Sequence, residues 1–83
     1  AQNRLYLLGS GKVFRKSEIY GRYISFMPLT EVVEGLTLKG FKYPLNRRRI
    51  VLGTSLCISN ELNGEEGIME VEKGVLICVE AHD

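Results

Sequence analysis

The sequence contains no tryptophan, one histidine and one aspartate, and these shortages exclude several kinds of chemistry. His82 and Asp83 occupy the last two positions, so they offer no serine–histidine–acid triad. Transfer of phosphoryl groups from ATP needs anchored Mg²⁺, which is usually held by aspartates together with phosphate and water oxygens. We therefore expect no catalysis from this chain alone.

Long apolar runs and an excess of charge are also missing. The longest apolar run, Val75–Val79, is far shorter than the roughly 20 residues that span a bilayer. Eleven basic and ten acidic residues leave a formal net charge of +1. This balance predicts no broad attraction to nucleic acid or to a membrane surface. Because the first residues show no secretory leader pattern, we expect a cytoplasmic location.

The chain has two cysteines, Cys57 and Cys78, and both fall in apolar stretches with the character of strands. We interpret them as buried thiols in a reducing compartment, and a disulfide between neighbouring strands is the alternative. The sequence contains no CxxC pair, so a metal site is not indicated.

Short apolar stretches separated by glycine recur about every 8–12 residues, a spacing typical of a β-sandwich or barrel. No stretch sustains a helical period, and at most one turn of helix is expected at 30–33. Because Gly9-Ser10-Gly11 favours a tight reversal, 4–8 and 12–15 are predicted to pair as a hairpin. We expect one all-β domain over 1–83. The predicted strands are 4–8, 12–15, 23–27, 33–38, 41–43, 49–51, 55–59, 67–72 and 75–80.

Two motifs carry most of the information. Gly35–Leu45 reads Gly-Leu-Thr-Leu-Lys-Gly-Phe-Lys-Tyr-Pro-Leu, and Ser59-Asn60-Glu61 follows it, with Gly64-Glu65-Glu66 close behind. In this order and at this spacing, they resemble the C-terminal substrate-binding domain of thiamine pyrophosphokinase, over roughly 22–79. The resemblance implies a small two-sheet antiparallel sandwich with jelly-roll-like topology. It also implies that the chain is a C-terminal fragment that lacks an N-terminal α/β catalytic domain.

The same resemblance implies a function. The whole enzyme would transfer pyrophosphate from ATP to thiamine, giving thiamine diphosphate and AMP. ATP and Mg²⁺ would be bound mainly by the missing domain. The enzyme would be a homodimer, with the thiamine site where this domain meets the α/β domain of the other subunit.

The candidate substrate site lies at the second motif. Alternation turns Ser55, Cys57 and Ser59 away from the core, and small polar side chains leave room for a flat ring. Asn60 offers both an acceptor and a donor, which matches the edge of an aminopyrimidine. The resemblance implies that Ser59 and Asn60 bind thiamine, and Cys57 is a further candidate. Ordinary turn chemistry is the alternative for Asn60 and is compatible with ligand contact, and Glu61 has no assigned role.

The first motif and the basic run after it have more than one interpretation. Phe41 and Tyr43 fall on one face of the predicted strand, so core packing is expected, with Lys42 in solvent. A structural loop near the substrate cleft is the alternative. Arg47-Arg48-Arg49 is either a solvated connection or a contact with the missing domain or a partner subunit.

Two other functions stay open at this point. Lys73 lies in a turn between two apolar strands, which is how lipoyl and biotinyl carrier domains present their modified lysine. A small β-barrel that binds single-stranded nucleic acid would use aromatic residues in a basic groove. The available aromatic residues are Phe14, Tyr20, Tyr23, Phe26, Phe41 and Tyr43.

Overall fold

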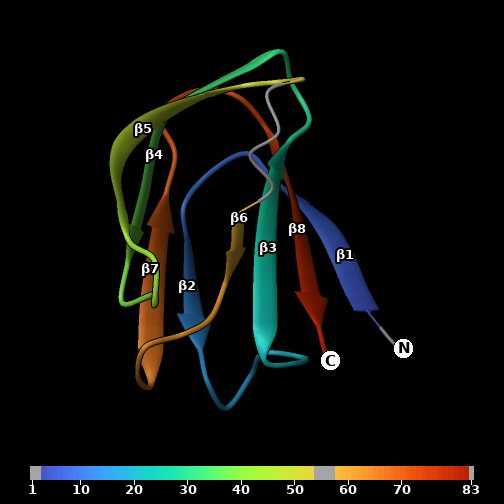
Figure 1. Ribbon diagram of the computed structural model, residues 1–83, viewed down its shortest axis with the longest axis vertical. Helices are drawn as coiled ribbons and strands as arrows, with labels where there is room; N and C mark the ends of the chain where they lie inside the picture. Colours follow the sequence, from blue (N-terminus) through green and yellow to red (C-terminus); the bar gives the residue numbers. More distant parts are fainter. Residues whose placement is uncertain (1–2, 54–57, 83) are drawn as a thin grey trace.

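Eight strands form two antiparallel sheets of four in the computed structural model, which describes residues 3–53 and 58–82 (Figure 1). No helix occurs within these ranges. The strands are β1 (Asn3–Leu8), β2 (Lys12–Arg15), β3 (Tyr23–Pro28), β4 (Val32–Lys39), β5 (Leu45–Val51), β6 (Ile58–Asn60), β7 (Glu66–Glu70) and β8 (Leu76–Ala81).

The strand order confirms the predicted jelly-roll sandwich. One sheet has the order β1-β8-β3-β6 and is called the β6 sheet below; the other has the order β2-β7-β4-β5 and is called the β5 sheet. Of the eight described strands, β4 and β5 are the only two that are both consecutive in the chain and paired with each other. Every other connection crosses from one sheet to the other, as in a double Greek key.

The predicted hairpin of 4–8 with 12–15 is wrong. β1 pairs with β8, and β2 pairs with β7 in the facing sheet. The glycine-rich turn does reverse the chain, but it also carries it across the sandwich. Tyr6 and Phe14 therefore meet the core from opposite sheets, which buries more apolar surface than a two-stranded hairpin would.

Three other local predictions need correction. The expected strand at 41–43 is a single bridge from Phe41 to Leu62, followed by a bend. Gly40 has a φ of 79°, and Pro44 has no N–H for a ladder, so the pairing stops on both sides. The strand expected at 49–51 begins at Leu45, and 30–33 forms no helical turn because β4 begins at Val32.

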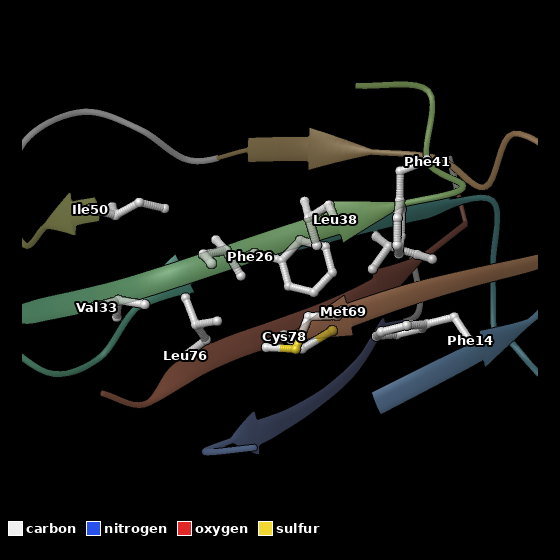
Figure 2. Close-up of a cluster of buried hydrophobic side chains, with 11 residues drawn as sticks. Phe14, Phe26, Val33, Leu38, Phe41, Ile50, Met69, Leu76 and Cys78 are labelled. Atoms are coloured by element: carbon white, nitrogen blue, oxygen red, sulfur yellow. The ribbon is translucent and has the colours of Figure 1, made fainter. Parts of the chain in front are cut away.

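The core centres on three phenylalanines contributed by both sheets and the bend (Figure 2). Phe14, Phe26 and Phe41 meet edge to face, with ring centroids 5.7 to 5.9 Å apart. Such pairs contribute about 0.5–1.5 kcal/mol each beyond their area of burial. Three of the six aromatic residues that a nucleic-acid-binding barrel would use for stacking are therefore enclosed in the core.

Candidate functional site

Ser59 lies on the outer face of the β6 sheet. Among the residues that the structure describes, β6 is an edge strand paired with β3 alone, with Ser25 opposite Ser59 and Ile24 opposite Asn60. Ser59 is exposed, as the alternation in the sequence predicts. Cys57, the other predicted contact on this face, lies outside the described residues.

Asn60 points the opposite way, into the sandwich, and its side chain is 0% exposed. Its Oδ1 atom accepts hydrogen bonds from the N–H of Tyr43, at 2.9 Å, and from the N–H of Glu61, at 3.0 Å. Its Nδ2 atom donates to the carbonyl of Tyr43, at 2.8 Å. One buried amide thus holds both main-chain polar groups of Tyr43.

These hydrogen bonds join the two sequence motifs, which lie 17 residues apart at Tyr43 and Asn60. Tyr43 itself is 55% exposed, so the expectation that it packs in the core beside Phe41 is wrong. The bend at 42–43 ends the alternation that would have turned both rings inward. The ammonium of Lys42 lies 5.6 Å from the centre of the Tyr43 ring.

Glu61 follows Asn60 and gathers two cations. Its carboxylate accepts a hydrogen bond from Nε of Arg22 at 2.9 Å, and Nζ of Lys42 lies 3.7 Å away. The Arg22 hydrogen bond is the main reason that the pKa of Glu61 is lowered; partial desolvation opposes it, and the charges of Arg22 and Lys42 reinforce it. Glu61 is therefore a carboxylate at neutral pH, and it connects Lys42 to the end of β6.

A pocket of about 410 Å³ opens beyond Glu61, where β6 and β8 end and β3 begins. Its apolar walls are Ile19 and Leu62, and Lys16, Gly21, Arg22, Glu61 and His82 complete the lining. The turn that forms one side is held by Glu80, a buried carboxylate that accepts hydrogen bonds from the Tyr20 N–H, at 2.6 Å, and from the Tyr6 hydroxyl. The volume falls in the range of small-molecule sites.

The described residues of the site are hydrogen-bonding, charged and aromatic groups. Within 3–53 and 58–82, no three histidine, cysteine or acidic side chains come together in a way that could hold a metal ion. The described residues therefore do not fit Mg²⁺. Cys78 is a buried free thiol, and burial raises its pKa to about 11, which removes it as a nucleophile at neutral pH.

The carrier-domain alternative loses its structural basis. Lys73 follows β7 and precedes β8, but these strands belong to different sheets, so Lys73 does not sit at the tip of a hairpin. Its main chain is bridged to Glu34, with its N–H and carbonyl both hydrogen-bonded there. A carrier lysine must instead project from a free tight turn.

Sequence reasoning missed several residues of this region. Tyr43 was assigned to the core, and Arg22 and Lys42 had no role. A signal was available for Asn60, because alternation from the outward-facing Ser59 indicates an inward side chain at the next position, although Asn60 was assigned to ligand contact. Of the predicted site residues that the structure describes, neither Ser59 nor Asn60 lines the pocket described above.

A jelly-roll sandwich whose described residues carry a polar, aromatic-edged surface and a side pocket has the architecture of a ligand-binding module. The family model described as thiamin pyrophosphokinase, vitamin B1 binding domain, matches residues 12–76, and the chain belongs to this family.

Similar proteins agree with this assignment. The thiamine pyrophosphokinase of Bacillus subtilis is 44% identical over 82 residues, which cover 99% of this chain and 38% of that protein. A crystal structure of the Bacillus subtilis enzyme matches with a TM-score of 0.89, at 44% identity and with the same coverage of both chains. The structure from Geobacillus thermodenitrificans matches at 36% identity and a TM-score of 0.88, covering 99% of this chain and 38% of that one. The chain thus spans 38% of the length of these relatives.

No helix within the described ranges has the length and apolar character needed to cross a membrane.

Proposed function

We propose that this chain is the thiamine-binding domain of a thiamine pyrophosphokinase. The observation that carries the proposal is that the two motifs of the vitamin B1 binding family meet physically, through the Asn60 amide, at one exposed surface. The pieces that identify the family in sequence therefore build one local structure, which is the property expected of a binding site.

The proposed thiamine site runs along the outer side of β6. Of the predicted substrate-binding residues, Ser59 faces this side, Asn60 belongs to the site from inside the sandwich, and Cys57 lies outside the described residues. The Ser59 hydroxyl is exposed and can hydrogen-bond to the aminopyrimidine edge. Tyr43 joins these residues, because its exposed ring can accept a thiazolium cation on its face. An aromatic wall with a few polar groups is the usual composition of a small-molecule site.

The proposed reaction belongs to a longer protein that carries this domain. The hydroxyl oxygen of thiamine attacks the β-phosphorus of ATP and loses its proton. The bond between the β-phosphorus and the oxygen bridging to the α-phosphate breaks, which releases AMP and leaves thiamine diphosphate. We assign ATP and Mg²⁺ to an N-terminal α/β catalytic domain, since the described residues here hold no candidate metal cluster.

We also assign the protein to the cytoplasm, where the buried free thiol of Cys78 is stable.

We further propose that the domain forms a homodimer through the outer face of the β6 sheet. Leu5 and Leu7 are 65% and 58% exposed, and the register aligns them with Val79 and Ile77 on β8. Met27 extends the same row on β3. An apolar face of this kind on a small domain usually marks an interaction site.

The β5 sheet has a different outer surface. Three of its exposed arginines form ion pairs with neighbouring glutamates: Arg15 with Glu66, Arg47 with Glu72, and Arg49 with Glu34. Charged edges and faces of this type resist sheet-to-sheet association. The contrast supports the β6 sheet as the dimer face, and Ser59 lies in the same row of residues as Leu5 and Val79.

The dimer can be tested by multi-angle light scattering. Replacing both Leu5 and Leu7 with lysine should give a monomer, because two charges would be desolvated in the interface. The control is Val13→Lys, which changes an exposed apolar residue of the other sheet. A wild-type chain that stays monomeric at high concentration contradicts the proposal.

Function can be tested on the longer protein by measuring thiamine diphosphate formed from thiamine, ATP and Mg²⁺. Ser59→Ala should raise the KM for thiamine several-fold and leave the KM for ATP unchanged, because Ser59 touches only the vitamin. Ser17→Ala, at another exposed serine, is the matched control. A wild-type protein that forms no thiamine diphosphate would overturn the proposed function.

A further inference from the structure

We propose that Asn60 acts as a positioning residue that raises thiamine affinity through Tyr43, without touching the vitamin itself. The inference rests on the proposed function, because it concerns how that site holds its ligand. It changes the role of Asn60 from a reader of the aminopyrimidine edge to a support behind the aromatic wall.

The hydrogen-bonding capacity of the Asn60 amide supports this role. A carbonyl oxygen has two lone pairs, and Oδ1 already accepts from the N–H groups of Tyr43 and Glu61. The amide nitrogen donates to the carbonyl of Tyr43. The side chain is also 0% exposed. A ligand donor could reach Oδ1 only by breaking a hydrogen bond that holds the protein's own main chain.

Tyr43 is the residue whose geometry Asn60 sets. Its N–H and its carbonyl both bind the same rigid amide, and Pro44 restricts the next backbone angle. The main chain is therefore fixed on both sides of a ring that remains 55% exposed. A ring that is ordered before the ligand arrives loses less conformational entropy on binding.

The same amide extends its influence to the charged neighbours of the ring. It fixes the N–H of Glu61, whose carboxylate holds Lys42 at 3.7 Å. Lys42 in turn lies over the Tyr43 ring, 5.6 Å from its centre. Loss of the Asn60 amide would release Tyr43, Glu61 and Lys42 together.

A double-mutant cycle on the KM for thiamine tests the inference in the longer protein. Tyr43→Ala should raise this KM about tenfold, the size of a partly desolvated cation–π contact. Asn60→Ala should raise it by a similar factor. The double variant should be no worse than Tyr43→Ala alone, because Asn60 acts only through the missing ring.

Direct contact by Asn60 gives a different result. The two effects would then multiply to about a hundredfold, and this outcome would overturn the inference. Ser59→Ala provides the reference for direct contact, since its effect should multiply with that of Tyr43→Ala. Absence of thiamine turnover in the wild-type protein would count against the proposed function. Multiplicative effects on the KM in an active protein would overturn only the positioning role of Asn60 and would leave the proposed function in place.

A second variant keeps the test valid if Asn60→Ala does not fold. Asn60→Asp retains the two acceptor contacts and loses the donor to the Tyr43 carbonyl. Because the chain has no tryptophan, Tyr43→Trp supplies a single fluorescent reporter at this position. Asn60→Asp should lower the fluorescence anisotropy of that reporter, and an unchanged anisotropy would contradict the positioning role.

Discussion

Replacing Asn60 with alanine should destabilise the domain more than any change at the neighbouring surface. The substitution removes the partners of three main-chain groups: the N–H and carbonyl of Tyr43 and the N–H of Glu61. The amide they lose is fully buried, so alanine leaves a small polar cavity in place of a satisfied network.

The size of the effect follows from the cost of unsatisfied groups. Each buried donor or acceptor left without a partner costs roughly 1–3 kcal/mol. Tyr43 is half exposed, so water can reach part of the gap, and we expect a total loss of about 3 kcal/mol. At roughly 0.05–0.15 kcal/mol per residue, a domain of this size has about 4–12 kcal/mol of stability. The single change therefore removes a quarter or more of the total.

Urea unfolding followed by circular dichroism measures this loss. With a slope of about 1–1.5 kcal/mol per molar urea, the midpoint should fall by about 2–3 M while the slope stays constant. Ser59→Ala changes the adjacent exposed residue and should shift stability by no more than about 0.5 kcal/mol. If Asn60→Ala unfolds at the same urea concentration as Ser59→Ala, the hydrogen-bonded junction does not support the fold, and the reasoning is refuted.

Two further predictions concern packing and charge. Gly67→Ala should lower the urea midpoint by an amount equivalent to about 1–3 kcal/mol. Its new Cβ would lie 2.8 Å from the nearest atom of a core phenylalanine ring, whereas Gly64→Ala has nothing within 4 Å and should be neutral. Glu61→Gln should lower the melting temperature at pH 7, because a carboxyl whose folded-state pKa is lowered adds stability above its unfolded pKa. The difference in melting temperature from wild type should disappear as the pH falls through that lowered pKa. A difference that persists unchanged at pH 2 would show that it does not come from the charge of Glu61. Glu18→Gln, at an exposed ion pair, is the control.

The sequence was sufficient for the strands and insufficient for some of their partners. Alternation and glycine spacing located most strands within a few residues of their observed bounds. The error at 4–8 and 12–15 arose because a glycine-rich turn indicates only that the chain reverses. It does not say whether the next strand joins the same sheet, and here burial of Tyr6 and Phe14 from opposite sides decides the outcome.

The site shows the same division between local and long-range information. Local alternation correctly turned Ser59 outward. The same alternation, extended by one residue, turns Asn60 inward, but Asn60 was expected to bind the substrate directly. The partner of Asn60 could not be predicted in this way, because Tyr43 is brought beside it by the bend after Gly40 and by pairing across the sandwich. Tyr43 itself was misplaced since the positive φ of Gly40 and the ring of Pro44 interrupt the alternation on which its assignment depended.

Titration of the ¹⁵N-labelled chain with thiamine, followed by two-dimensional NMR, shows whether the surface along β6 binds the vitamin. We expect progressive shifts of the amide signals of Ser59, Tyr43 and Glu61, with a Kd of about 1 mM or weaker for this domain alone. Signals of the exposed connection around Lys73 should stay in place. Absence of any shift at tens of millimolar thiamine, or shifts confined to residues far from β6, would contradict this expectation.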